Sequence, residues 1–167
     1  ALLGTEEHGR WQLAPADPVV EVTRRYRPGT LVLETRSTTA TGTVEVVDCM
    51  PIRGDGRLDV VRLVRGIEGR VPMRMQLVAR FDHGSIVPWV HRVDDALRFV
   101  AGPDALALTT SIPHHPEGMT TVAEFVVEAG DEVPFDLAWG PSHLPIPAPI
   151  AVAESIERTT NWWRAWS

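Results

Sequence analysis

The stretch Met73-Arg74-Met75-Gln76-Leu77-Val78-Ala79-Arg80-Phe81 predicts the fold class, because apolar and polar side chains alternate along most of it. In an extended chain, successive side chains point to opposite faces. One face would then carry the apolar residues Met73, Met75, Leu77, Ala79 and Phe81. This period of two is typical of a strand with one buried and one solvated face, and such strands occur in antiparallel sheets.

The same alternation recurs along most of the first 140 residues. It covers Val20–Tyr26, Thr30–Thr38, Thr43–Asp48, Asp59–Ile67, Val87–Val93, Leu97–Ala101, Leu106–Thr110, Thr121–Glu128 and Val133–Trp139. About ten short strands with no helical periodicity among them predict an all-β protein, a two-sheet antiparallel β-sandwich. Four more residues join Met73, Met75, Leu77 and Phe81 in the expected core: Phe125, Val127, Phe135 and Leu137.

Turn residues separate the strands, as in Arg27-Pro28-Gly29, where Pro followed by Gly favours a type II turn. Pro134 lies inside a predicted strand, and its missing N–H predicts an edge position or a bulge there.

Composition narrows the class of protein. A length of 167 residues suits one domain, and the net charge of −6 argues against a nucleic-acid partner. All 16 basic residues are arginine, as is common in GC-rich bacteria, so Schiff-base lysine chemistry is excluded. No apolar run approaches the roughly 18 residues of a membrane span. Cys49 is the single cysteine and cannot form an internal disulfide, so we expect a cytoplasmic protein.

The chain divides into three parts by pattern. Residues 1–140 form the predicted β-domain, which we expect to be truncated at its N-terminus because Ala1-Leu2-Leu3-Gly4 lacks an initiator Met. Residues 141–149 are rich in proline and predict an extended linker. Residues 150–167 begin a helix, because apolar side chains recur there at three- and four-residue spacing.

Three tryptophans lie in the last turns of that helix: Trp162, Trp163 and Trp166. Trp163 and Trp166 share a stripe with Ile156, whereas Trp162 points about 100° away. No stop signal follows, so we expect the helix to lead into a further domain and the indoles to pack against it. The alternative is that they fold back on this chain's own core. In isolation, a second copy would cover them and give a homo-oligomer.

Few residues have the spacing of a catalytic or metal site. His114-His115 with Glu117 suggests a metal, but no further ligand stands at a recognisable spacing, so a solvated loop is preferred. Cys49 ends an apolar strand and is expected to be a buried small side chain rather than a nucleophile. The aspartates fall mostly at predicted turns. We therefore predict no catalytic residue, no metal and no cofactor.

Three residues are candidates for contact with a sugar. Asp82 and His83 follow a strong strand, and a carboxylate beside an imidazole is half of an acid–base pair, although a simple turn is the preferred reading. Trp89 lies beside Pro88, where an aromatic ring could stack on a sugar, or it could belong to the core.

Several segments together resemble the N-terminal domain of bacterial glycoside hydrolases of family fifteen, the glucoamylase-like and trehalase-like enzymes. They are, in chain order, Ala1–Trp11, Arg24–Thr35, Val47-Asp48-Cys49-Met50-Pro51, Arg70-Val71-Pro72-Met73, Phe81-Asp82-His83-Gly84, Pro88-Trp89-Val90 and Trp162-Trp163-Arg164-Ala165-Trp166. The resemblance implies a β-supersandwich followed by a linker helix and an (α/α)6 barrel. It also implies inverting hydrolysis of an α-glucosidic bond by two glutamates of that barrel, which this chain does not contain.

On this resemblance the chain is expected to be a non-catalytic accessory domain, with the barrel as its partner and an α-glucoside as the substrate of the parent enzyme. Asp82, His83 and Trp89 would then touch the rim of the active site. The family's stretch immediately upstream, which would supply the first strands, is missing, and this predicts an unpaired sheet edge. The alternatives are an independent carbohydrate-binding module and a sandwich with sugar chemistry of its own.

Overall fold

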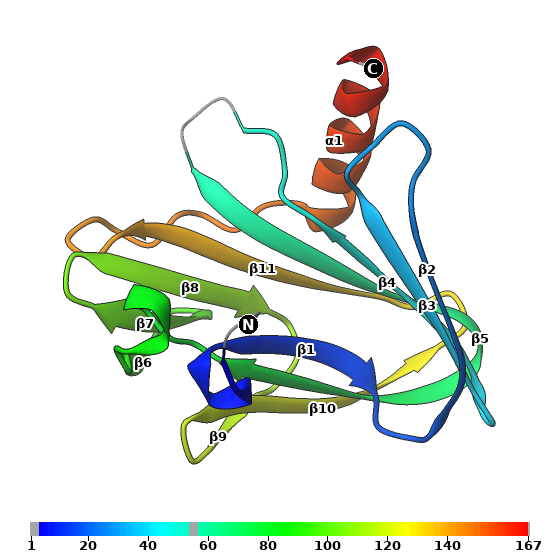
Figure 1. The fold of residues 1–167 in the computed structure, drawn as a ribbon, viewed down its shortest axis with the longest axis horizontal. Coiled ribbons are helices and arrows are strands. Elements are labelled where there is room, and N and C mark those ends of the chain that lie inside the picture. Colours follow the sequence, from blue (N-terminus) through cyan, green and yellow to red (C-terminus); the bar gives the residue numbers. More distant parts are fainter. Residues whose placement is uncertain (1–3, 54–56, 167) are drawn as a thin grey trace.

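The structure is a computed structural model, and it describes residues 4–53 and 57–166 of the chain (Figure 1). Within these two ranges, eleven strands precede one α-helix: β1 (Arg10–Pro15), β2 (Val19–Tyr26), β3 (Leu33–Thr39), β4 (Gly42–Cys49), β5 (Leu58–Val78), β6 (Trp89–Val93), β7 (Ala96–Ala101), β8 (Asp104–Thr110), β9 (His115–Glu117), β10 (Thr120–Glu128), β11 (Glu132–Pro141) and α1 (Val152–Trp166). Two 3-10 turns complete the order: η1 (Glu6–His8) and η2 (Asp82–Gly84).

The strands form two antiparallel sheets stacked face to face, as the alternation predicts (Figure 1). The larger sheet has the order β2-β3-β4-β5-β11-β8-β7-β6, and the smaller has β1-β5-β10-β9. All of the pairs are antiparallel. The two-sheet all-β class is therefore confirmed.

One strand belongs to both sheets. The first half of β5 pairs with β4 and β11 in the larger sheet, and its second half pairs with β1 and β10 in the smaller. It turns the corner at Gly66–Gly69, where the register with β4 shifts and Gly69 has a φ of +65°. A Cβ at Gly66 would lie 1.9 Å from the Glu128 carbonyl oxygen. Only glycine permits this close approach, so the two glycines fold one long strand across the sandwich.

The main core fills the space between the sheets and contains the residues that the alternation predicts to face inward. Met73, Met75, Leu77, Val127 and Phe135 are at most 3% exposed, and Phe81, Phe125 and Leu137 pack against them. Val44, Val46 and Val64 come to the same core from the larger sheet.

A second core lies on the opposite face of the larger sheet, under α1 (Figure 1). Val152 and Ile156 of the helix pack there on Val32, which precedes β3, and on four side chains of the sheet: Val47, Cys49, Val61 and Leu63. The first three turns of the helix therefore belong to this domain. The Pro-rich segment also lies on the sheet, because the Arg98 guanidinium donates to the carbonyl oxygens of Ser142 (2.7 Å) and Leu144 (2.9 Å).

The structure departs from the predicted strands in three places. Asp59–Ile67 and the stretch after Met73 are one continuous strand, β5. Short strands β1 and β9 appear where no strand was predicted. Pro134 lies in β11, which is an interior strand, but β8 pairs with β11 only from Phe135 onward. The proline therefore stands at a locally unpaired edge, where its missing N–H is tolerated.

Candidate functional site

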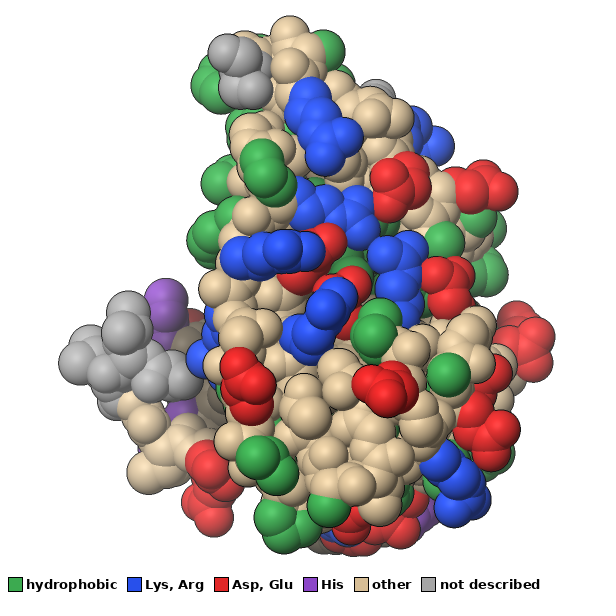
Figure 2. Space-filling view, turned by 90° about the vertical axis from the view of Figure 1, so that its right-hand side faces the viewer, with side chains coloured by type: hydrophobic (Ala, Val, Ile, Leu, Met, Phe, Trp, Pro, Cys, Tyr) green, Lys and Arg blue, Asp and Glu red, His purple; other side chains and the backbone are tan. Residues whose placement is uncertain are grey.

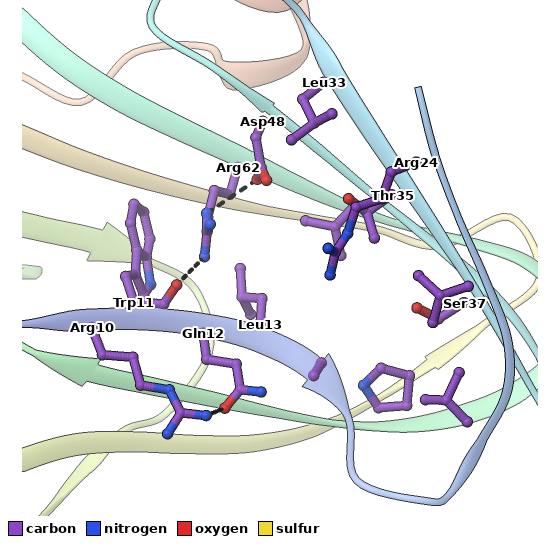
Figure 3. Close-up of a pocket in the computed structure, with 15 residues that line it drawn as sticks. Arg10, Trp11, Gln12, Leu13, Arg24, Leu33, Thr35, Ser37, Asp48 and Arg62 are labelled. Atoms are coloured by element: carbon purple, nitrogen blue, oxygen red, sulfur yellow. Dashed lines mark hydrogen bonds and ion pairs between the residues drawn. The ribbon is translucent and has the colours of Figure 1, made fainter. Parts of the chain in front are cut away.

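A hollow lies between the sheets at the end formed by β1, β2 and β3 (Figure 3). It is a cleft of about 500 Å³. All eight residues of β2 are exposed, because the larger sheet extends past β1, the edge strand of the smaller sheet. The inner face of β2 and β3 is thus left uncovered among the described residues.

An ion pair forms one wall of this cleft. Arg62 of β5 and Asp48 of β4 stand opposite each other, with Nε and Oδ1 3.1 Å apart. The Arg62 guanidinium also donates to the Trp11 carbonyl oxygen (2.6 Å) and lies 4.7 Å from the centre of the Trp11 ring. Burial raises the pKa of Asp48 and lowers that of Arg62, and each partner's charge opposes the shift of the other. The charged pair is therefore held inside a mostly apolar sandwich.

A network of polar contacts fixes α1 to the larger sheet. Arg27 donates to Glu34 of β3 (2.7 Å), to Glu157 of the helix (2.7 Å) and to the Thr160 hydroxyl (3.1 Å). The Ile52 N–H donates to the fully buried Thr159 hydroxyl at 3.1 Å. Basic and acidic side chains lie side by side on this face of the molecule (Figure 2). These bonds hold the helix in one orientation on the sheet.

Two buried aspartates lie under the start of the helix. Asp59 of β5 is 2% exposed and pairs with Arg53 (3.1 Å), while Asp136 of β11 is 4% exposed and accepts the Ile150 N–H. Burial, together with the charge of Asp59, raises the pKa of Asp136 to about 6. Asp136 therefore gains a proton more readily in the folded chain than in the unfolded one.

We predict that Asp136→Asn stabilises the domain at neutral pH. A raised folded pKa contributes stability that is complete below the ordinary value of 3.8 and is lost as pH rises through about 6. Asn has no such titration, so the variant should gain about 3 kcal/mol over the wild type at pH 8 and almost nothing at pH 3.5. Urea unfolding at the two pH values measures the difference. The exposed turn variant Asp95→Asn serves as the control, and an equal gain there would contradict the assignment.

The three tryptophans of α1 form one cluster beyond the part of the helix that rests on the sheet. Trp162 and Trp166 are stacked, with centroids 6.2 Å apart, and Trp163 meets both edge-on at 4.9 and 5.6 Å. Trp162 is 41% and Trp166 71% exposed. The expected separation of Trp162 from the other two is therefore not found, because residues four apart lie one turn apart on the same side. The indole cluster is a single apolar surface.

The sugar-contact candidates lie away from this cluster and do not share one pocket. Asp82 and His83 form the η2 turn with φ values of 47° and 55°, and Asp82 accepts a hydrogen bond from Ser85 at 3.0 Å. Trp89 is 69% exposed, stacks on His91 with centroids 4.2 Å apart, and borders a separate cavity of about 250 Å³. Neither Asp82 nor His83 lines that cavity. Trp89 is thus a surface ring and not part of the core.

The remaining candidates have ordinary environments. His114 contacts Arg92 at 2.9 Å, and His115 lies in β9, 3.3 Å from Glu117. No group of three His, Cys, Asp or Glu side chains in the described ranges could hold a metal ion. Cys49 is buried, and burial raises the pKa of its thiol to about 11. It is therefore the inert small side chain that its apolar strand predicts.

Four charged residues lie in strands, although the sequence pattern placed them at turns or did not single them out. Asp48, Asp59, Arg62 and Asp136 lie within strands and are partly or fully buried. Asp48 and Arg62 interrupt the inward, apolar positions of their strands, and such an interruption is the signal that could have revealed them.

No helix in the described part of the chain has the length and apolar character needed to cross a lipid bilayer.

Comparison with known proteins finds a family and several relatives whose descriptions agree with one another. The family described as trehalase-like, N-terminal, matches residues 1–163. A trehalase of Mycobacterium tuberculosis is 28% identical over 95% of this chain, and one of Mycolicibacterium smegmatis is 29% identical over 95%. Trehalase 1 of Sulfolobus acidocaldarius is 25% identical over 93%.

The aligned region is 27% of each mycobacterial relative and 26% of the Sulfolobus protein, so the chain spans about a quarter of their lengths. The family match covers nearly the whole chain and agrees with the two-sheet fold that carries one terminal helix. The chain belongs to the trehalase-like N-terminal domain family.

Proposed function

We propose that this chain is a non-catalytic accessory domain of an inverting α-glucoside hydrolase, trehalase-like or glucoamylase-like, and that it supports an (α/α)6 catalytic barrel of the same polypeptide. The observation that carries this proposal is the exposed indole cluster at the end of a helix that is fixed to the sheet. The relatives are named trehalases and are about four times as long as the chain, which leaves room for such a barrel.

The helix is built as a rigid platform. Its first turns are buried, and Arg27 and Ile52 bind its polar side chains, so the direction in which the indoles project is fixed. Three clustered tryptophans expose more apolar area than a soluble surface normally leaves uncovered. A barrel packed on Trp162, Trp163 and Trp166 would cover it. In the isolated chain, a second copy of the chain covers these three indoles instead of the barrel.

The buried carboxylates support a non-catalytic role. Asp59 and Asp136 lie under the linker and the helix start, and Asp48 is engaged by Arg62. An inverting glycosidase needs an acid and a base on opposite faces of a bound sugar. These contacts support a structural role for the aspartates, and we propose that the catalytic pair belongs to the barrel. The parent is proposed to be a bacterial, cytoplasmic enzyme, with Asp82, His83 and Trp89 at the rim of its active site.

A second candidate function is an independent carbohydrate-binding module. The observation in its favour is Trp89, whose exposed ring borders a cavity together with Met119, which is also 69% exposed. One face of the indole rests on His91. The other could meet the apolar face of a sugar ring.

The test of the accessory role uses the full-length parent enzyme. Trp162→Ala with Trp166→Ala should lower the melting temperature of the catalytic part and reduce its turnover of trehalose or maltose at least tenfold, because a docking surface is lost. Trp89→Ala, a second exposed tryptophan, is the matched control and should leave the melting temperature unchanged.

The isolated chain completes the test. It should hydrolyse neither trehalose nor maltose, and turnover that disappears on substitution of Asp82 or His83 would overturn the accessory role. Binding of an α-glucan by the isolated chain that Trp89→Ala abolishes, with unchanged enzyme activity in the Trp162→Ala and Trp166→Ala variant, would establish the binding module instead.

A further inference from the structure

Three polar side chains on the inner face of β2 and β3 have no partner in the described part of the chain. Arg24 stands directly opposite Thr35, and Ser37 follows two residues along β3 on the same face. None of the three side chains makes a hydrogen bond or ion pair there, although all three line the inter-sheet cleft. The arginines on the opposite face differ, because Arg25 and Arg36 are paired with Glu34 and Glu45.

The cleft has the dimensions and composition of a ligand site. Its volume of about 500 Å³ lies in the range of small-molecule pockets, and apolar side chains stand between its polar ones. Figure 3 shows the Arg24 guanidinium reaching from the sheet edge toward the middle of the cleft, with Asp48 and Arg62 at the far wall. A ligand that enters beside Arg24 would therefore extend toward the ion pair.

The charge in the cleft favours an anion. Of the three arginines that line it, Arg62 is balanced by Asp48 and Arg10 by Glu6. Arg24 is left as the uncompensated charge. Its planar fork of donors matches a phosphate or carboxylate group, and neighbouring hydroxyls can donate to the same oxygens. The Asp48 carboxylate at the far wall can accept hydrogen bonds from hydroxyl groups but would repel a second anion.

We propose that this cleft binds a phosphorylated sugar. The phosphate lies between Arg24, Thr35 and Ser37, and the hydroxylated ring extends toward Asp48 and Arg62. This site is independent of the indole cluster and of the accessory role, since it uses only the two sheets.

Isothermal titration calorimetry of the 167-residue chain with glucose 6-phosphate tests the proposal, with inorganic phosphate and glucose as separate probes. Glucose 6-phosphate should bind, and at least tenfold more tightly than either part alone. Arg24→Ala should weaken binding at least tenfold, and Arg24→Lys should restore only part of it because the fork is lost. Thr35→Val, which keeps the side-chain shape, should weaken binding about fivefold.

Arg25→Ala is the matched control, because Arg25 neighbours Arg24 in β2 but pairs with Glu34 on the other face. It should leave the affinity unchanged, and the melting temperature of each variant shows whether the fold is kept. The proposal is overturned if no probe binds, if Arg25→Ala weakens binding as much as Arg24→Ala, or if inorganic phosphate binds as tightly as glucose 6-phosphate.

Discussion

Replacing Phe135 by Ala is expected to lower the free energy of unfolding by about 3–5 kcal/mol. Phe135 is completely buried in the middle of β11, and its ring lies 5.7 Å from that of Phe125 across the two sheets. The substitution removes the apolar contacts of a large ring and leaves a cavity that the surrounding strands fill only in part. Because β11 is paired on both sides, its backbone cannot move inward without disturbing β5 and β8.

Chemical denaturation followed by circular dichroism measures this loss. Val126→Ala is the control, since Val126 lies in β10 and is 40% exposed, and a change under about 1 kcal/mol is expected there. A loss under about 1 kcal/mol for Phe135→Ala would mean that the two sheets do not close on this ring.

Replacing Asp48 by Asn is expected to change the free energy of unfolding by about 1 kcal/mol or less at neutral pH, because the desolvation that raises the pKa of Asp48 offsets the attraction to Arg62 that the variant loses. Arg62 would keep its bond to the Trp11 carbonyl oxygen but would lose the only carboxylate within ion-pair distance in the described ranges. An uncompensated guanidinium in the sandwich keeps its desolvation cost without the compensating attraction.

The double variant Asp48→Leu with Arg62→Met removes both charges and so measures what the intact pair contributes to the free energy of unfolding. The single variant instead measures the effect of leaving one charge without its partner. Exchanging both charges for apolar side chains should keep the stability within about 1 kcal/mol of the wild type or raise it. Urea unfolding of the single and double variants gives the coupling, with the exposed Asp95→Asn as the control for the chemical change. If the double variant is less stable than the wild type by more than about 2 kcal/mol, the ion pair is itself needed for the fold.

The retention of this pair has a functional meaning in the proposed scheme. Burying Asp48 and Arg62 between apolar strands costs desolvation free energy that their mutual attraction offsets only in part. Two apolar side chains of similar volume would therefore stabilise the fold as well. The pair lies at the wall of the same cleft that Arg24, Thr35 and Ser37 line. A stability gain in the double variant, together with loss of sugar phosphate binding, would identify the pair as kept for the ligand.

The fold class and most of the core follow from the alternation of side chains along the chain. Alternation along β5 and β11 identifies the inward residues, because a strand with one wet face must separate apolar from polar side chains at every second position. A second local pattern, the three- and four-residue spacing of one helix face, located the terminal helix from Val152, Ile156 and Thr159, all of which are buried. These features depend on neighbours in the sequence, so they can be read without knowing the partner strands.

Which residues the strands bring together depends on how the strands pair in the folded chain. Short strands β1 and β9 exist because β5 and β10 offer them hydrogen-bonding edges, a preference their own residues do not carry. Asp48 meets Arg62, and Arg24 meets Thr35, only through the registers of β4 with β5 and of β2 with β3. The cleft itself arises because one sheet extends past the other. Such contacts join residues distant in sequence, and no local pattern of side chains specifies them.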